Sequence, residues 1–154
     1  MPKLTACLWF DGQAEEAANF YVSVFKNSRI TQISRFGEGG PMPAGTVMVV
    51  AFDIENQSFC ALNGGPQYKF SEATSFQVPC ETQDEIDYYW SKLTAGGEAG
   101  PCGWLKDKFG VSWQVFPASL PQLLSGGGDA AKGKRVFQKM MTMQKINVEA
   151  LQNA

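Results

Sequence analysis

The chain has 154 residues, of which 44% are hydrophobic and 18% charged, and thirteen basic against fifteen acidic side chains leave a net charge of −2. This composition is typical of a folded domain with a proper core and excludes a disordered chain. The chain has no basic stripe of the kind that binds nucleic acid, and no apolar run long enough to span a membrane. It also has no histidine, which excludes Ser-His and Cys-His nucleophile pairs.

The N-terminal segment and the cysteines indicate the compartment. The first ten residues lack the small-residue cleavage site of a secretory signal, and they run directly into a strand-like pattern. Four widely spaced cysteines form no CxxC pair; they are Cys7, Cys60, Cys80 and Cys102. We therefore expect a cytoplasmic protein with reduced thiols, in preference to a disulfide framework.

Two stretches of the chain repeat one pattern, a strand followed by an amphipathic helix. The strand-like "KLTACLWF" precedes "DGQAEEAANFYVSVF", and "ATSFQVPC" precedes "ETQDEIDYYWSKL", with apolar residues at helical spacing in both helices. Thr82 with Glu85 predicts a capping box on the second helix. A shift of 68 residues places Ala18 on Ile86 and matches the preceding strands as well, which favours an internal duplication.

Strand-like runs follow each helix, so each half is predicted as β-α-β-β-β. In the first half they cover residues 28–36, 45–54 and 57–64, and in the second a short stretch near 96–101, then 103–108 and 111–116. Asp107 and Lys108 are interpreted as a solvated turn before the last strand, and Trp113 as a core residue.

The segment after Ser119 has a different character. It is predicted as a short "SLPQLL", a flexible "SGGGDAAKG" over residues 125–133, and then helical "KRVFQKMMTMQKI" and "NVEALQ".

Strand parity separates an apolar face from a mixed one, because successive side chains point to opposite faces. The apolar faces, expected under helices, carry Leu4, Ala6, Leu8 and Phe10 in the first strand, Phe76 and Val78 after the linker, and Trp113 and Val115 in the last strand. The mixed faces carry Thr5, Cys7 and Trp9, then Ser75 and Gln77, then Ser112, Gln114 and Phe116. Such a mixed face suits a small-molecule pocket, and the alternative is a solvated face with an exposed or dimer-facing Trp9.

Three long motifs resemble one known family: "LWFDGQAEEAANFYVSVF", "FQVPCETQDEIDYYWSKL" and "CGWLKDKFGVSWQVFP". They are similar to the PhnB-like branch of the vicinal oxygen chelate (glyoxalase and bleomycin-resistance) superfamily, often catalogued as 3-demethylubiquinone-9 3-methyltransferase. The resemblance implies an α+β fold in which two βαβββ modules form a cup of curved mixed sheet, with helices on the convex side. It places a glyoxalase-like domain at 1–118, with modules at 3–64 and 72–117, and a helical tail at 119–154. It also implies a homodimer.

The resemblance further implies four metal-ligand positions. They fall on Thr5 or Ala6, near Asn63, on Thr74 or Ser75, and on Gln114. Their neutral oxygens bind zinc or nickel poorly and can at best help to hold a hard divalent cation. No transition metal or other cofactor is therefore expected, and glyoxalase-type isomerisation is expected to be lost. The glycine-rich segments are interpreted as loops, not as an S-adenosylmethionine site.

The leading hypothesis is a dimeric protein that binds a small molecule and neither nucleic acid nor membrane. The expected ligand-binding residues are Thr5, Trp9, Asn63, Ser75, Gln77, Trp104 and Gln114. One alternative is an enzyme on the same scaffold, either the nominal methyltransferase or a hard-metal-dependent lyase, isomerase or dioxygenase. Another is a resistance-type protein that sequesters an aromatic or cationic compound between tryptophans. No catalytic residue is identified.

Overall fold

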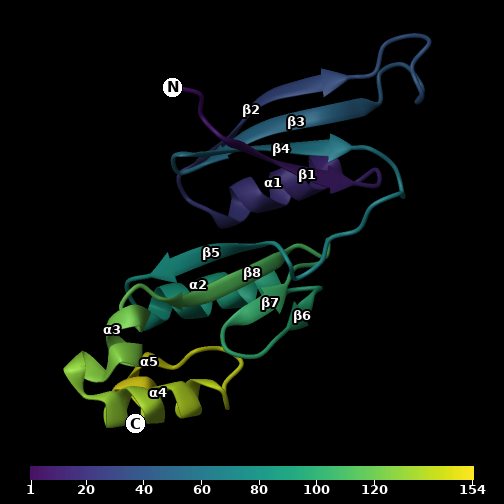
Figure 1. Ribbon diagram of the computed structural model, residues 1–154. Coiled ribbons are helices and arrows are strands. Elements are labelled where there is room, and N and C mark those ends of the chain that lie inside the picture. Colours follow the sequence, from purple (N-terminus) through teal and green to yellow (C-terminus); the bar gives the residue numbers. More distant parts are fainter. The chain divides into compact units, whose positions relative to one another are not determined.

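Two units with the same element order make up the computed structural model, which describes residues 1–154: Met1–Phe70 and Ser71–Ala154 (Figure 1). The first unit contains β1 (Thr5–Phe10), α1 (Ala14–Val24), β2 (Ser28–Arg35), β3 (Val47–Ile54) and β4 (Gln57–Asn63). Its sheet has the order β1-β4-β3-β2, in which β1 and β4 are parallel and the other pairs antiparallel.

The second unit repeats this topology and adds a tail. It contains β5 (Ser75–Cys80), α2 (Gln83–Thr94), β6 (Glu98–Ala99), β7 (Trp104–Lys106) and β8 (Ser112–Pro117), in the sheet order β5-β8-β7-β6 with β5 and β8 parallel. The tail consists of α3 (Leu120–Ser125), the 3-10 turn η1 (Gly126–Gly128), α4 (Ala130–Met140) and α5 (Val148–Gln152). The α+β class and the two βαβββ modules are confirmed, while closure of the sheets into a cup stays a prediction.

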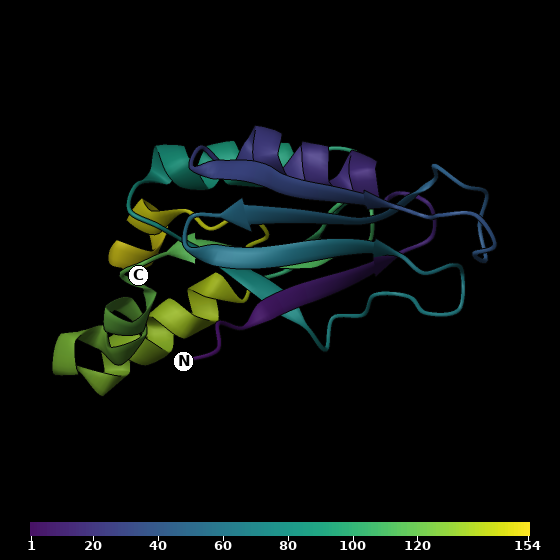
Figure 2. The same ribbon diagram turned by 90° about the horizontal axis from the view of Figure 1, so that it is seen from above.

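The core of the first unit lies between its sheet and α1, which runs along one face of the strands (Figure 2). Leu8 and Phe10 of β1 are buried on that face as the parity predicted, and the buried Tyr21 of α1 stacks on Phe52 with ring centroids 6.0 Å apart. Leu4 was expected on the same face but is 87% exposed, because it precedes the first residue of β1.

The second unit buries α2 against its sheet through Ile86 and Leu93. The predicted cap of α2 is present, since the Thr82 hydroxyl accepts a hydrogen bond from the Glu85 N–H at 3.2 Å. The Glu85 carboxylate in turn accepts one from the Glu81 N–H at 3.0 Å, one residue before the cap. Trp113 is 3% exposed, which confirms its assignment to the core.

The tail corrects one prediction. Residues 125–133, expected to be flexible, form η1 and the first turn of α4, and the Asp129 carboxylate accepts hydrogen bonds from the N–H groups of Ala131 and Lys132. The three glycines of η1 have positive φ, so they supply a tight turn instead of a loose linker. Gly133 is buried inside α4, where a Cβ would overlap the Leu124 carbonyl of α3.

The tail has a core of its own, and it packs on the βαβββ module of the second unit. The buried residues of this core are Val136, Met140, Ile146 and Leu151. Gln83 at the start of α2 connects to it, since its side chain donates to the Ile146 carbonyl at 3.0 Å and accepts from the Val148 N–H at 2.9 Å. No helix in the structure has the length and apolarity needed to cross a membrane.

Candidate ligand-binding face

The second sheet brings four of the predicted ligand-binding residues onto one face. Gln77 pairs with Gln114 across β5 and β8, and Gln114 pairs with Trp104 across β8 and β7. Ser75 lies two residues before Gln77 on the same strand and therefore on the same side. The buried Trp113 points the other way, toward α2. These four side chains therefore form the face without a helix, which we call the polar face.

Gln114 and Ser75 are joined at the centre of the polar face. The Gln114 Nε2 group donates a hydrogen bond to the Ser75 hydroxyl at 2.8 Å. This bond leaves the Gln114 Oε1 atom as an acceptor and the Ser75 hydroxyl hydrogen as a donor. An amide in the middle of an otherwise apolar strand is thus held by a neighbour on the adjacent strand, and the pair presents an acceptor beside a donor.

A hollow of about 210 Å³ lies at the edge of this face, next to Trp104. It is lined by Glu72, Glu98, Ala99, Gly100, Pro101, Trp104, Leu105, Lys106 and Ser112. Ser112 is 1% exposed, and its hydroxyl has no hydrogen-bond partner. A buried hydroxyl without a partner destabilises a fold by about 1–3 kcal/mol, so this group has a capacity for hydrogen bonding that a molecule in the hollow can use.

An ion pair between Lys106 and Glu72 lies at the rim of the hollow. The hydrogen bond and the charge of each partner lower the pKa of Glu72 and raise the pKa of Lys106. Both groups are largely exposed, so the pair adds little stability. Because Glu98 also lines the hollow, two carboxylates face one ammonium group there, and the lining has one excess negative charge.

Asp107 corrects the interpretation of the charged turn. It is 3% exposed, and its Oδ1 atom accepts hydrogen bonds from the N–H groups of Phe109 at 2.9 Å and Val111 at 3.0 Å. Its Oδ2 atom accepts from the Trp113 indole N–H at 2.9 Å. The solvated turn was wrong for Asp107, because three N–H donors satisfy its carboxylate inside the fold, whereas Lys108 is exposed as expected. This anchor fixes the turn between β7 and β8, and so fixes the strands that carry Trp104 and Gln114.

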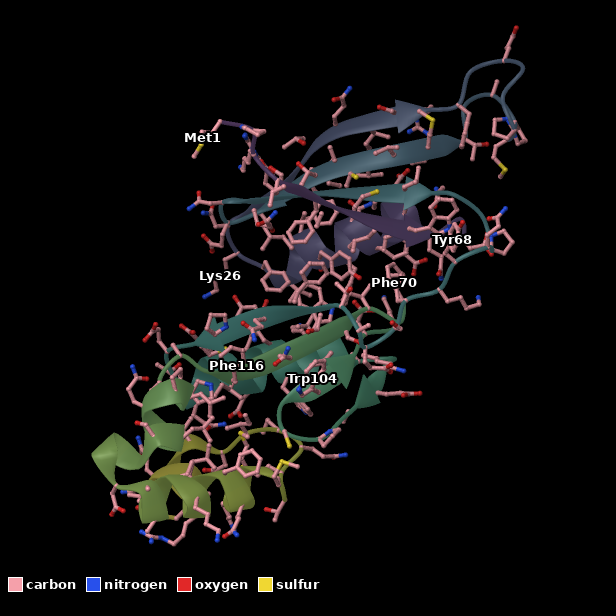
Figure 3. The ribbon with its side chains drawn as sticks, in the orientation of Figure 1. Met1, Lys26, Tyr68, Phe70, Trp104 and Phe116 are labelled. Atoms are coloured by element: carbon pink, nitrogen blue, oxygen red, sulfur yellow. The ribbon has the colours of Figure 1, made fainter.

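The opposite end of the polar face meets the tail. Phe116 follows Gln114 on the same side of β8 and packs against the tail core (Figure 3). Within the second unit, the polar face is therefore bounded by the tail at one end and by the hollow at the other.

In the first unit, Thr5 and Trp9 lie on the face of the sheet opposite α1. Trp9 is held in place by two contacts. Its indole N–H donates to the Gly65 carbonyl at 2.8 Å, and its ring meets that of Tyr68 edge-on, with the ring centroids 5.0 Å apart. A Cβ on Gly64 would overlap the Trp9 ring, so glycine is required beneath it.

Asn63 lies apart from Thr5 and Trp9, on the side of the sheet that α1 covers. Its Oδ1 atom accepts from the Ala14 N–H at 2.9 Å, and its Nδ2 group donates to the Val47 carbonyl at 3.0 Å. Gln13 provides no side-chain cap for α1, so Asn63 replaces that cap from β4. The amide predicted to bind ligand is thus already used to hold the helix on the sheet.

The residues present do not fit the divalent metal that the resemblance implies. The four ligand positions offer only neutral oxygens, the Asn63 amide is engaged with backbone, and the Gln114 amide is bonded to Ser75. No group of three or more His, Cys, Asp or Glu side chains in the chain is arranged to hold a metal ion.

A nucleotide-bearing cofactor such as S-adenosylmethionine does not fit the turns of this chain either. The strand-to-helix turns are residues 11–13, 81–82 and 118–119, and Gly12 is the single glycine among them. The glycine-rich segments instead join β2 to β3, follow β4, and join α3 to α4. None of these segments opens a helix after a strand, which is the arrangement that holds nucleotides.

Comparison with known proteins shows a family match and several similar structures. The family model described as 3-demethylubiquinone-9 3-methyltransferase matches residues 2–116. The solved PhnB protein from Bacillus cereus is 40% identical, with 74% of this chain and 98% of that chain covered and a TM-score of 0.66.

Two fosfomycin resistance proteins share the fold. FosX from Mesorhizobium loti is 14% identical; the match covers 81% of this chain and 96% of FosX, with a TM-score of 0.56. A mutant of FosX from Listeria monocytogenes, solved with Mn(II) and a dihydroxypropylphosphonic acid, is 19% identical, with 77% and 93% coverage and a TM-score of 0.54. At such identities the likeness shows the fold alone. No curated protein matches the chain.

Proposed function

Since the chain belongs to the PhnB-like, 3-demethylubiquinone-9 3-methyltransferase family of the vicinal oxygen chelate superfamily, we propose that it binds a small organic molecule on the polar face without a transition metal. The observation that carries this proposal is the strand register, which sets Gln77, Gln114 and Trp104 side by side in one row. An aromatic wall beside a few oriented polar groups is the usual composition of a small-molecule site.

The chemistry of the face favours a flat, neutral ligand. Trp104 offers a ring for stacking, while Gln114 and Ser75 offer an acceptor and a donor to one polar group. A hydroxyl, a primary amide or a protonated carboxyl group both donates and accepts, so it matches this pair. The excess negative charge that Glu72 and Glu98 leave beside Lys106 disfavours an anionic ligand.

The hollow beside Trp104 accommodates a substituent of the ligand. Its volume of about 210 Å³ is below the roughly 300–1,000 Å³ of sites that enclose whole drug-sized molecules. It is therefore too small for a nucleoside cofactor, and we derive no methyl transfer from it. The Ser112 hydroxyl at its wall would hydrogen-bond a polar atom of the substituent.

The remaining predictions are part of the proposal. Ligand contacts at Thr5 and Trp9 stay predictions, and so does the contact at Asn63, whose amide is used within the fold. We also expect a cytoplasmic homodimer, and the four cysteines are free thiols, as a reducing compartment requires. Light scattering after size exclusion tests the dimer, for which a monomer at micromolar concentration is the contradicting result.

A fragment screen tests the function. We expect neutral aromatic fragments carrying a hydroxyl or amide to raise the melting temperature of the protein, whereas S-adenosylmethionine and divalent metals leave it unchanged. Gln114→Leu and Trp104→Ala should each weaken the best fragment about tenfold, which corresponds to about 1.4 kcal/mol. The control Gln138→Leu lies on the exposed side of α4.

Two results would overturn the proposal. One is a stoichiometric transition metal found by elemental analysis of the purified protein. The other is a fragment affinity that both polar-face variants leave intact. Mass spectrometry of the best fragment after incubation also separates simple binding from turnover on the same face.

A further inference from the structure

The open face of the first sheet carries a pair of thiols that the proposed function does not use. Cys7 of β1 and Cys60 of β4 are direct partners in the parallel pairing of these strands. Cys7 lies between Thr5 and Trp9 on the side of the sheet away from α1, and directly paired residues share a side. Both are free, with Cys7 exposed and Cys60 partly buried.

The two thiols interact with each other. Burial, a hydrogen bond with Cys7 and the charge of Cys7 together raise the pKa of the Cys60 thiol to about 11. Cys60 therefore keeps its proton near neutral pH, while the exposed Cys7 is the sulfur that a dissolved oxidant meets first.

The other cysteines lack this arrangement. Cys80 is 1% exposed, and burial followed by the charges of Glu85 and Glu81 raises its pKa to about 12. Cys102 lies beside a thioether, with its sulfur 3.4 Å from that of Met141. The two serve as internal comparisons for the reactivity of the pair.

Strand geometry permits a bond between Cys7 and Cys60 and makes it a strained one. Adjacent strands lie about 4.7–4.9 Å apart, which falls at the short end of the roughly 4.4–6.8 Å that a disulfide spans between Cα atoms. Direct partners project side by side, so their Cβ atoms must approach to about 3.5–4.5 Å before the sulfurs can join. A disulfide formed under such strain is readily reduced.

We propose that Cys7 and Cys60 form a modification site, at which a peroxide converts the two thiols to a reversible disulfide between β1 and β4. The Cys7 thiolate attacks one peroxide oxygen, the O–O bond breaks, and the leaving hydroxide takes a proton to become water. The resulting Cys7 sulfenic acid is attacked by the Cys60 sulfur, the S–O bond breaks, and the thiol proton leaves with the hydroxide as a second water. Two thiols lose two electrons, and one hydrogen peroxide becomes two waters.

The test uses the full chain and hydrogen peroxide. After treatment with about one equivalent of peroxide, free thiols are blocked with N-ethylmaleimide in denaturant, so that the buried Cys80 also reacts, and the protein is digested with trypsin. Because each cysteine falls in a separate tryptic peptide, we expect one cross-link, between residues 4–26 and 36–69. The intact protein should lose two hydrogens, bind two maleimides instead of four, and return to four after incubation with glutathione.

Serine variants show which cysteines form the cross-link. Cys7→Ser and Cys60→Ser should each abolish the cross-link, and Cys102→Ser should leave it intact. If a serine variant fails to fold, the peptide map of the unsubstituted protein still identifies the two linked cysteines. Over-oxidation of Cys7 without a cross-link, a cross-link to Cys80 or Cys102, a bond only between two chains, or resistance to glutathione would each overturn the proposal.

Discussion

The open faces of the two sheets differ in chemistry although their strands follow the same order. In the first unit this face carries the Cys7–Cys60 thiol pair and a tryptophan pinned by the loop after β4. In the second it carries the bonded Gln114–Ser75 pair, an ion pair and a hollow. Topology decides which positions share a face, and the residue types at those positions decide what the face can bind. A duplicated scaffold can thus hold two different sites.

The two units also differ in how a polar side chain supports its sheet. Asn63 in the first unit bonds the start of α1, whereas Asp107 in the second bonds a turn and the Trp113 indole. Asn63 is a neutral amide of intermediate exposure, and Asp107 is a buried carboxylate with three donors. Removal of the charged anchor should therefore destabilise the fold more than removal of the amide.

The largest effect is expected from Asp107→Ala. The change leaves two backbone N–H groups and the Trp113 indole N–H buried without an acceptor. Hydrogen bonds to a charged group contribute about 1.5–3 kcal/mol each, and they are not additive, so we expect a loss of about 3–5 kcal/mol in the free energy of unfolding. Urea unfolding measures it, and the exposed carboxylate variant Asp11→Ala should change stability by less than about 0.5 kcal/mol. Equal stabilities for the two variants would contradict the role of Asp107 as an anchor.

An intermediate effect is expected in the first unit from Gly64→Ala. The new Cβ overlaps the Trp9 ring, which must leave its place and lose the hydrogen bond to Gly65. Overpacking of this kind destabilises a fold by about 1–3 kcal/mol. Gly37→Ala is the matched control, since no atom lies within 4 Å of its Cβ and its φ is not positive. Thermal unfolding and tryptophan fluorescence measure both variants, and an unshifted spectrum in Gly64→Ala would show that Trp9 is not held there.

The smallest effect concerns the rim of the hollow. Lys106→Met should raise the pKa of Glu72 toward its ordinary value, because the hydrogen bond and charge of Lys106 lower it. A lowered pKa contributes stability above the ordinary value of 4.5, and that contribution is lost as pH falls through the folded-state pKa. Since both groups are exposed, the change in stability should be slight and weaker in high salt. NMR titration of the Glu72 carboxyl carbon measures the shift, with Lys134→Met as the control. A Glu72 pKa that Lys106→Met leaves unchanged would contradict the ion pair at the rim.

The sequence was sufficient for the strands and helices of the two βαβββ modules and for the faces of their strands, because both depend on local periodicity. It did not indicate the η1 turn and the start of α4 in residues 125–133, where local composition favoured a flexible segment. Parity alone grouped Ser75 with Gln77 on the side opposite Phe76 and Val78, and the observed register extends that group to Gln114 and Trp104. The duplication was visible because both helices keep the same apolar spacing after their strands.

Two polar residues have roles that the sequence did not indicate, because partners brought to them by folding determine those roles. Asn63 bonds a helix start 49 residues away, and no local pattern carries that information. Asp107 looks like a turn residue until Trp113 is seen to donate to it. The pairing of Cys7 with Cys60 likewise requires the parallel contact of β1 with β4, which joins strands at opposite ends of the first unit's sequence.

The most direct test of the ligand-binding role of the second sheet is an NMR titration of ¹⁵N-labelled protein with the strongest fragment of the screen. We predict that the side-chain amide signals of Gln77 and Gln114 and the indole signal of Trp104 shift together with one dissociation constant, while the buried indole of Trp113 stays in place. Shifts confined to residues outside this face, with those three signals unmoved at saturation, would contradict it.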